Sequence, residues 1–211
     1  MKITGVFGGT FDPAHLGHLA VAAAAVKKCN LDEIKFIPCY QSPHKKRPQA
    51  TDEQRINMLE LAVADYNNFT VDKSEINRGG ISYMIDTLKQ LQQHKPLCLI
   101  MSMDAFAKFN SWHKWREILQ LAHLIIANRP DSVSMADEIK EQLKQRQISN
   151  PDKLQTTSSG YIYLLDIEPN TICATEVRER IKANKNINSL VPKKVKQYIM
   201  ANKIYNPHDP L

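Results

Sequence analysis

An α/β fold with a doubly wound parallel sheet and flanking helices is predicted by three features of the 211-residue sequence. Short apolar runs alternate with longer stretches of helical periodicity, which is the order of repeated strand–helix units. The run at residues 97–101 is continuously apolar, as in a strand buried on both faces of a parallel sheet. A hydrophobic fraction of 43% and a charged fraction of 24% favour a folded chain over a disordered one.

The first elements are predicted from residue types that begin or end strands and helices. A strand at residues 3–7 runs into a Gly-Gly pair, and an Ala-rich, Pro-free helix follows at 16–28. Pro38 ends a second strand at residues 34–37. These signals predict the first strand–helix–strand unit of the sheet.

The next elements are predicted from a capping pattern and from apolar spacing. Thr51 and Gln54 form a capping-box pattern that begins a helix at residues 51–65, with apolar residues along one face. A short strand at 69–71 and a helix at 82–93 follow. The strand at 97–101 then continues the alternation.

The last third of the chain continues the same alternation and closes with helices. Further strands are expected at 124–127 and 161–165, a polar helix at 135–147, a loop at 150–159, and two final helices at 175–183 and 193–202. We therefore expect one domain over residues 1–205, with a helical C-terminal portion at about 174–203 and a tail at 206–211.

Composition and charge exclude several classes of protein. The 28 Lys and Arg against 22 Asp and Glu give a net charge of +6, which suits a polyanionic ligand but also an ordinary surface. No apolar run approaches the roughly 18 residues of a membrane-spanning helix, and the N-terminus has no long apolar region of a signal peptide. Four scattered Cys without zinc spacing indicate reduced thiols and a cytoplasmic protein.

The first strand is followed by the most informative segment, residues 8–18, which reads Gly-Gly-Thr-Phe-Asp-Pro-Ala-His-Leu-Gly-His. Adjacent glycines and a helix N-terminus together suit the binding of phosphate. His15 and His18 share one face of that helix, and Gly17 between them leaves the pocket open. A Gly-Gly turn or a single His is common in structural roles, but their combination in a strand-to-helix turn favours a ligand site. The spacing matches neither of the two common glycine-rich phosphate motifs.

These residues resemble a known signature. Gly8-Gly9-Thr10-Phe11-Asp12-Pro13 with His15-x-Gly17-His18 is similar to the ATP-binding motif of the HxGH nucleotidyltransferase superfamily, most closely in the bacterial nicotinate mononucleotide adenylyltransferase family. The resemblance covers nearly the whole chain. It implies a Rossmann-like fold and adenylyl transfer from ATP to nicotinate mononucleotide, giving nicotinate adenine dinucleotide and pyrophosphate in NAD biosynthesis. It also implies magnesium, carried by the ATP phosphates, and no metal held by the protein itself.

The resemblance implies an ATP site and a set of catalytic residues. The catalytic residues would be His15, His18 and Arg178, and the ATP-binding residues Gly8, Gly9, Thr10, Phe11, His18, His44, Lys45, Thr175 and Arg178. His44 and Lys45 belong to a Pro-His-Lys element that the family uses to contact the triphosphate. Taken alone, the three cations at residues 45–47 are typical of a solvated loop.

A second signature lies near the C-terminus, where residues 172–178 read Ile-Cys-Ala-Thr-Glu-Val-Arg. We expect Thr175 to be the N-cap of the following helix. Arg178 then falls in the first turn, where a cation is unfavourable to the helix dipole, and this indicates a role in binding phosphate. Pairing with Glu179 or with another surface acid is the structural alternative. Cys173 stands where the family usually has Ser.

The acceptor nucleotide is expected in the middle of the chain. The resemblance implies substrate-binding residues at Ser82, Tyr83, Met84, Asp104 and Trp112. Backbone amides around Met84 would receive the nicotinate carboxylate, although the family commonly has Thr there. Ser102 replaces a family Gly near Asp104. Trp112 would stack on the nicotinate ring, whereas Trp115 is as well explained by helix packing.

The expected mechanism needs no general base, because the attacking 5′-phosphate is already anionic. Positioning and electrostatics would carry the reaction. His18, with His15, would donate hydrogen bonds to the phosphates, which should favour its protonated form. Lys45 and Arg178 would hold the β- and γ-phosphates.

Three alternatives remain open from the sequence. A relative of the same superfamily would act on nicotinamide mononucleotide or phosphopantetheine instead. A class I aminoacyl-tRNA synthetase is disfavoured, because no Lys-Met-Ser-Lys-Ser-like segment and no tRNA-reading domain is present. A non-catalytic nucleotide- or RNA-binding module would interleave aromatic residues with Lys and Arg, and aromatics are only 7%. We therefore expect small-molecule partners, without nucleic acid or membrane, and the oligomeric state stays open.

Overall fold

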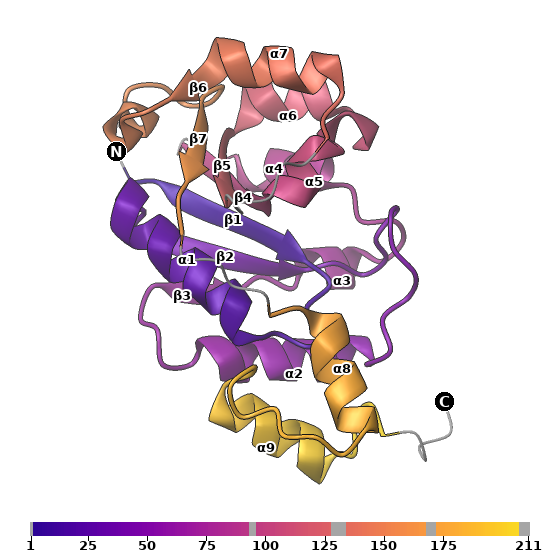
Figure 1. Ribbon diagram of the computed structural model, residues 1–211. Coiled ribbons are helices and arrows are strands. Elements are labelled where there is room, and N and C mark those ends of the chain that lie inside the picture. Colours follow the sequence, from indigo (N-terminus) through magenta and orange to yellow (C-terminus); the bar gives the residue numbers. More distant parts are fainter. Residues whose placement is uncertain (1, 93–95, 128–133, 168–171, 207–211) are drawn as a thin grey trace.

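The computed structural model describes residues 2–92, 96–127, 134–167 and 172–206. The strands of these residues are β1 (Thr4–Gly9), β2 (Glu33–Pro38), β3 (Phe69–Val71), β4 (Leu97–Ser102), β5 (His123–Ala127), β6 (Gln147–Ile148) and β7 (Ile162–Leu165). They form one sheet in the order β3-β2-β1-β4-β5-β7-β6, and every pairing is parallel. The predicted doubly wound parallel sheet is confirmed (Figure 1). The strand order reverses between β1 and β4, so a ligand site is expected at the carboxyl ends of these strands.

The described residues also contain the helices that cover this sheet. They are α1 (Leu16–Cys29), α2 (Asp52–Val63), α3 (Ser74–Arg78), α4 (Met84–Leu91), α5 (Met103–Ala107), α6 (Trp115–Leu121), α7 (Asp137–Arg146), α8 (Ala174–Lys182) and α9 (Lys193–Ala201). Short 3-10 helices lie at Phe109–Ser111 and Pro151–Gln155. None of the helices in the described ranges is long and apolar enough to cross a membrane.

Two hydrophobic clusters lie on the two faces of the sheet. One packs α1, α2, α8 and α9 against side chains such as Ile3 and Phe36. The other packs α4, α6 and α7 against side chains such as Val6 and Leu99. All residues of β5 and all but the last of β4 are buried, because both faces of these central strands are covered.

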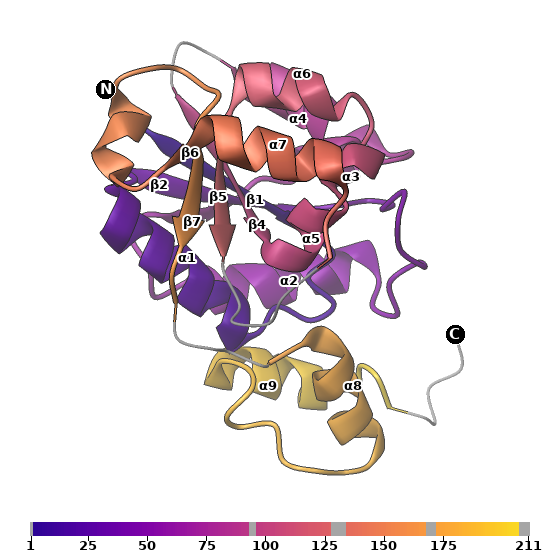
Figure 2. The same ribbon diagram turned by 45° about the horizontal axis from the view of Figure 1, so that its top comes forward.

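The C-terminal helices α8 and α9 sit beside α2, below the sheet in both views (Figures 1 and 2). Asn57 donates to the Tyr198 hydroxyl at 3.0 Å, and Lys194 pairs with Asp65 at 2.5 Å. Ile181, Val195 and Ile199 belong to the same cluster as α1 and α2, so apolar burial holds the C-terminal portion to the rest of the chain.

Every strand and helix predicted from the sequence is present, with small differences at the ends. The capping box of Thr51 and Gln54 is confirmed, since each side chain accepts from the other residue's backbone N–H. The helix predicted to begin at Ser82 begins at Met84 instead, because Tyr83 has extended backbone angles. The predicted end of that helix at residue 93, and residues 207–211 of the predicted tail, lie outside the described residues.

His123 is a fully buried polar side chain at the start of β5, away from the carboxyl edge of the sheet. Its Nδ1 accepts from the Tyr161 backbone N–H at 3.1 Å, and its Nε2 lies 3.1 Å from the Thr157 carbonyl. Since Nδ1 accepts, Nε2 carries the proton and donates. The neutral ring therefore satisfies both contacts, and burial lowers the pKa of His123.

This arrangement predicts that acid destabilises the fold partly through His123. The unfolded chain binds a proton near the ordinary pKa of 6.5, whereas the folded chain binds it only at lower pH. The free energy of unfolding therefore falls as the pH drops below that value, by at most about 1.4 kcal/mol per pH unit from this group. Urea unfolding at about pH 7.5 and at about pH 5.0 measures how far the free energy of unfolding falls between these two pH values. This decrease should be smaller for His123→Gln than for the natural protein. Equal losses would contradict the assignment.

Candidate active site

The turn after β1 lies where the strand order reverses. Gly8 and Gly9 end β1, between neighbours β2 and β4, and α1 begins at Leu16. The first turn of α1 carries no acidic residue, so the partial positive charge of the helix N-terminus is not offset. The segment between strand and helix is thus suited to an anion.

His15 and His18 lie together at the start of α1. Their rings are stacked, with centroids 3.6 Å apart and planes 26° apart. The His15 backbone N–H donates to Nδ1 of His18 at 3.2 Å. This bond fixes the proton of a neutral His18 on Nε2, the nitrogen that remains available to donate to a ligand. The predicted pairing of the two histidines in one place is confirmed.

The pKa of His18 is well below its ordinary value of 6.5 in the protein alone. Burial is the largest cause, and the nearby His15 and Lys45 lower the pKa further. His18 is therefore a neutral donor at neutral pH until an anion arrives. The expected protonation by phosphates concerns the loaded site and stays a prediction.

Phe11 supports His18 from within the core. Its side chain is 2% exposed, and its ring lies 5.0 Å from that of His18 and 5.8 Å from that of Phe36, edge to face in both cases. Phe11 has a positive φ of 50°, which turns the chain sharply after Thr10. A contact between Phe11 and ATP stays a prediction, and its buried ring leaves only the backbone for that contact.

Two glycines of the segment are surrounded closely. A Cβ on Gly17 would lie 3.0 Å from Nδ1 of His15 and 3.3 Å from the Ile172 carbonyl oxygen. A Cβ on Gly8 would collide with the end of the Met84 side chain. Met84, predicted to bind the acceptor, thus lies directly against the turn predicted to bind ATP.

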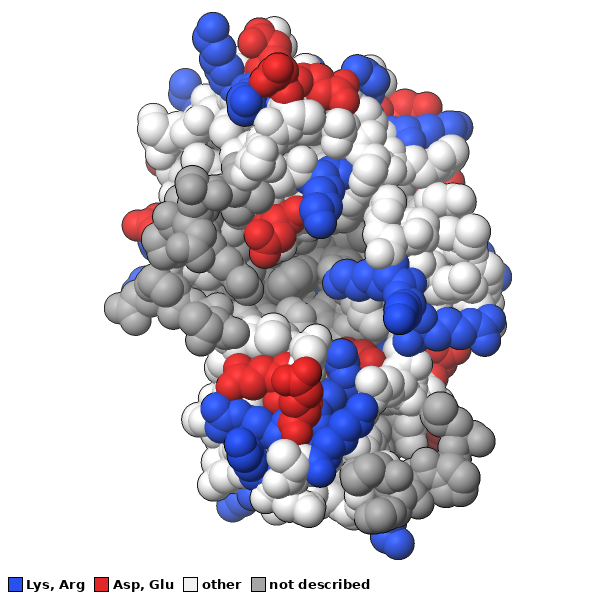
Figure 3. Space-filling model, turned by 45° about the vertical axis from the view of Figure 1, so that its right-hand side comes forward, with Lys and Arg blue, Asp and Glu red and all other residues white. Residues whose placement is uncertain are grey.

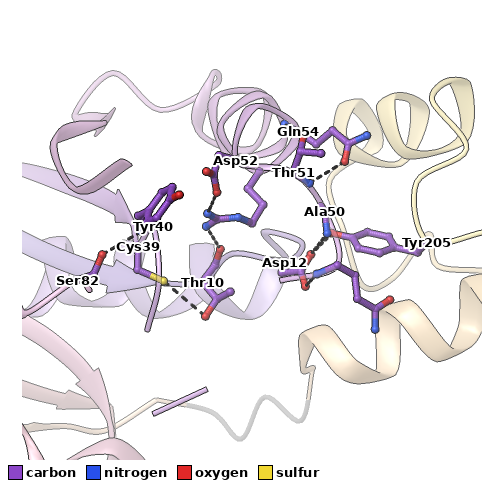
Figure 4. Close-up of polar contacts among 12 residues, drawn as sticks. Thr10, Asp12, Cys39, Tyr40, Ala50, Thr51, Asp52, Gln54, Ser82 and Tyr205 are labelled. Atoms are coloured by element: carbon purple, nitrogen blue, oxygen red, sulfur yellow. Dashed lines mark hydrogen bonds and ion pairs between the residues drawn. The ribbon is translucent and has the colours of Figure 1, made fainter. Parts of the chain in front are cut away.

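The Asp12 carboxylate is buried and accepts hydrogen bonds from three donors in two parts of the chain. The Gln49 backbone N–H donates to Oδ2 at 2.9 Å, and the Ala50 backbone N–H donates to Oδ1 at 3.1 Å. The Tyr205 hydroxyl also donates to Oδ1, at 2.8 Å (Figure 4). Sequence reasoning gave Asp12 no role of its own, because its partners are distant in the chain.

Arg178 reaches the same turn from α8. Its Nη1 donates to the Asp12 carbonyl at 2.6 Å and its Nη2 to the Thr175 hydroxyl at 3.3 Å. The side chain is 19% exposed. The structure therefore pairs Arg178 with the glycine-rich segment and not with Glu179, and its role in binding phosphate stays a prediction.

One prediction about α8 is wrong. The N-cap is Cys173, whose Sγ accepts from the Glu176 backbone N–H at 3.5 Å, and Thr175 lies inside the first turn. Cys173 has the extended backbone angles of an N-cap, and its sulfur takes the place of the usual hydroxyl. Thr175 instead accepts from Arg178 and steadies the guanidinium.

Arg55 is a second arginine behind the turn, and sequence reasoning missed it. It is 0% exposed, although it carries a charge. Its Nη1 donates to the Thr10 carbonyl at 2.8 Å, and its Nη2 pairs with Asp52 at 2.5 Å. Arg55 thereby holds Thr10 in place and adds positive charge beneath the anion site.

The Pro-His-Lys loop after β2 projects beside this turn. Lys45, Lys46 and Arg47 are exposed, and Lys45 is near enough to lower the pKa of His18. Figure 3 shows a hollow across the middle of one face of the molecule, with cationic side chains beside it. The ring of His44 lies 6.4 Å from that of Trp112, so the loop also borders the predicted acceptor side.

The segment predicted to bind the acceptor is attached to the same loop. The Ser82 backbone N–H donates to the Gln41 carbonyl at 2.9 Å, and the Tyr40 N–H donates to the Ser82 hydroxyl oxygen at 3.0 Å. The buried Glu75 accepts from Thr87 at 2.6 Å and is also hydrogen-bonded to Ser82. Burial raises the pKa of Glu75, while these hydroxyls lower it.

Aromatic side chains lie on the side predicted to bind the acceptor. The rings of Tyr83 and His113 lie 4.5 Å apart, and Trp112 is only partly buried against Phe109. Trp115 is 6% exposed and packs in the core, which confirms the structural alternative for this residue. Trp112 remains available to a ligand.

Ser102 and Asp104, which the sequence also placed near the predicted acceptor site, lie at the start of α5. Ser102 caps the helix by accepting from the Ala105 N–H at 3.3 Å, which gives its hydroxyl a structural use. Asp104 is exposed one residue into the helix. Its predicted contact with substrate stays a prediction.

No group of three or more His, Cys, Asp or Glu in the described ranges could hold a metal ion. The nearest buried carboxylate to the turn, Asp12, is already used by two amides, a hydroxyl and Arg178. Mg²⁺ is commonly bound through substrate phosphates and few protein ligands. This donor set fits a magnesium ion that is carried by a nucleotide.

Comparisons with known proteins place the chain in a family. Residues 6–180 match the cytidylyltransferase-like family. A relative from Methylococcus capsulatus, named "probable nicotinate-nucleotide adenylyltransferase", is 37% identical over 95% of this chain and 98% of its own. A relative of the same name from Serratia proteamaculans is 35% identical over 95% of this chain and 94% of its own. The chain belongs to the nicotinate-nucleotide adenylyltransferase family.

Solved structures of Plasmodium falciparum nicotinic acid mononucleotide adenylyltransferase share the fold of this family member. One, complexed with NaAD, has a TM-score of 0.69 and 16% identity, and the other, complexed with APC, has 0.68 and 17%. Each comparison covers 97% of this chain and 98% of the other. The Rossmann-like nucleotidyltransferase fold expected from the sequence is thereby confirmed.

The space around Gly17 yields a prediction for this family member. Gly17→Ala should displace the His15 ring, because its Cβ meets both that ring and the Ile172 carbonyl. A misplacement of about 1 Å can lower turnover about 100-fold, so the smaller displacement expected here should lower kcat/KM by roughly tenfold.

Ala20→Gly is the matched control, on an exposed position of the same helix. It should lower the free energy of unfolding by about 1 kcal/mol and leave kcat/KM unchanged. An unchanged kcat/KM in a folded Gly17→Ala protein would contradict the prediction, because it would show that activity does not depend on the position of the His15 ring.

Proposed function

We propose that this protein transfers the adenylyl group of ATP to nicotinate mononucleotide, giving nicotinate adenine dinucleotide and pyrophosphate in NAD biosynthesis. Similarity over nearly the full length to nicotinate-nucleotide adenylyltransferases supports this activity. The observation that carries the proposal is the convergence of His18 and Arg178 on one turn. His18 presents Nε2 there, and Arg178 is held by the Asp12 carbonyl.

The reaction is an in-line displacement at the α-phosphorus of ATP. An oxygen of the 5′-phosphate of nicotinate mononucleotide forms the new P–O bond, and the bond from the α-phosphorus to the bridging oxygen breaks. Pyrophosphate leaves with that oxygen and its electron pair. The attacking phosphate is already anionic, so the site has to align two polyanions and stabilise the charge on the leaving group.

Each hydrogen-bond donor of the site has a part in that task. His18 donates through Nε2 to the phosphates, with His15 stacked behind it. Arg178 binds a phosphate with its planar donors, and Lys45 and His44 approach the triphosphate from the exposed loop. The amides of Gly8, Gly9, Thr10 and Phe11 face the nucleotide, and Thr175 steadies Arg178. Magnesium, carried by ATP, supplies further charge to the phosphates when it is bound.

The acceptor is bound by the segment that hydrogen bonds tie to the loop after β2. Backbone amides at Tyr83 and Met84 receive the nicotinate carboxylate, and Trp112 stacks on the ring. The Ser82 amide is already bonded to the Gln41 carbonyl, so Ser82 fixes this segment in place. Support comes from the partial exposure of Tyr83 and Trp112 and from the anchoring of Ser82 at Tyr40 and Gln41. Asp104 contacts the nucleotide from the start of α5.

We also propose that residues 1–205 form one nucleotidyltransferase domain with a helical C-terminal portion at about 174–203. Shared burial of α8 and α9 with α1 and α2 supports a single domain. The use of ATP and four cysteines in the thiol form suit an enzyme of the cytoplasm.

A pyrophosphate-release assay tests the activity. Purified protein is given ATP and magnesium with nicotinate mononucleotide, nicotinamide mononucleotide or phosphopantetheine in parallel. We expect the highest kcat/KM with nicotinate mononucleotide. A higher kcat/KM with nicotinamide mononucleotide would identify that nucleotide as the acceptor and would attribute the change in preference to Met84. No release of pyrophosphate with any of the three acceptors would contradict the proposed function.

His18→Asn is the mechanistic control in the same assay. Removing one transition-state donor typically lowers turnover about 100-fold, so kcat should fall by about that factor with little change in the KM for either nucleotide. An unchanged kcat would remove His18 from the catalytic set.

A further inference from the structure

Tyr205 is a buried tyrosine at the C-terminal end of the described chain, beyond α9. It is 7% exposed, and its hydroxyl lies 2.8 Å from Oδ1 of Asp12 and 3.9 Å from Sδ of Met58. The shorter distance and the negative charge make Asp12 the acceptor. Burial and the Asp12 carboxylate raise the pKa of Tyr205, so the hydroxyl keeps its proton and donates.

This hydroxyl occupies one side of a carboxylate that also lies close to Arg178. Oδ1 of Asp12 accepts from Tyr205 and from the Ala50 N–H, while Oδ2 accepts from the Gln49 N–H. Nη1 of Arg178 lies 3.7 Å from Oδ2 and donates to the Asp12 carbonyl at 2.6 Å. The carboxylate is thus held at ion-pair distance from the guanidinium, too far away for a hydrogen bond.

We infer that Tyr205 is a positioning residue of the ATP site, which acts through Asp12 on Arg178. The inference rests on the proposed function, in which Arg178 binds a phosphate of ATP. By fixing the carboxylate, Tyr205 prevents Asp12 from turning toward Arg178 and competing with that phosphate. The turn after α9 thereby sets the affinity of a site built around the first strand. Figure 4 shows the Tyr205 hydroxyl directed at Asp12.

A purely structural role for Tyr205 would be the docking of the C-terminal helices, and the chain offers a matched control for it. The Tyr198 hydroxyl, on α9, accepts from Asn57 on α2 at 3.0 Å. Tyr198 and Tyr205 therefore each join the C-terminal portion to the rest of the domain through one hydroxyl. Only Tyr205 contacts Asp12.

The experiment compares Tyr205→Phe with Tyr198→Phe in the pyrophosphate-release assay and in urea unfolding. A hydrogen bond to a charged group is worth about tenfold in an equilibrium constant, so Y205F should raise the KM for ATP about tenfold. The KM for nicotinate mononucleotide should stay within about twofold, since Tyr205 contacts no residue proposed to bind it. Y198F should lower the urea midpoint without changing either KM.

A double-mutant cycle with Arg178→Ala tests the route. If Tyr205 acts through Arg178, adding Y205F to R178A should not raise the KM for ATP further. Tyr205→Leu serves as a second hydroxyl-free variant, and it should give the same KM pattern as Y205F.

Some outcomes overturn the inference. An unchanged KM for ATP in folded Y205F, an additive effect with R178A, or a similar rise in KM for ATP in Y198F would each assign Tyr205 to docking alone. The natural protein serves as the reference, because its failure to release pyrophosphate would contradict the proposed function and not the role of Tyr205.

Discussion

The buried carboxylate of Asp12 is the interaction on which the rest of the site depends. An ionised carboxylate with little exposure is strongly unfavourable unless hydrogen bonds compensate for the lost water. Asp12 obtains hydrogen bonds from the backbone before α2 and from Tyr205 after α9, and it forms an ion pair with Arg178 on α8. Folding therefore cannot bury the turn after β1 without drawing these three segments against it.

The charged groups around Asp12 also explain how a site for a polyanion is built from side chains with little solvent exposure. Arg55 and Arg178 both approach the turn, and both donate to its backbone carbonyls, of Thr10 and Asp12. Asp12 and Asp52 offset their charges, which makes two guanidiniums tolerable near the core. ATP then adds negative charge to a framework that is already fixed, as electrostatic preorganisation requires. The net charge of +6 was compatible with this arrangement but did not indicate it.

The fold and the motif segments could be predicted from the sequence because they are local. Apolar runs marked β4 and β5, a capping box marked α2, and the pair of histidines marked the start of α1. The short helices α3, α5 and α6 were missed because few residues carry their periodicity. The polar network could not be predicted, since Asp12 and Tyr205 are far apart in sequence and nothing local in either indicates the other. The N-cap of α8 was misplaced for a chemical reason, because the sulfur of Cys173 performs the task usually assigned to a hydroxyl.

Calorimetric titration of magnesium–ATP into Asp12→Asn and into the natural protein tests the central role of this carboxylate most directly. The amide keeps the size of Asp12 but weakens its charge-assisted bonds to Tyr205 and the two backbone amides, each worth about 1.5–3 kcal/mol. We predict a folded protein in which the dissociation constant for ATP rises about tenfold or more and that for nicotinate mononucleotide changes little. An unchanged affinity for ATP in folded Asp12→Asn would contradict the account.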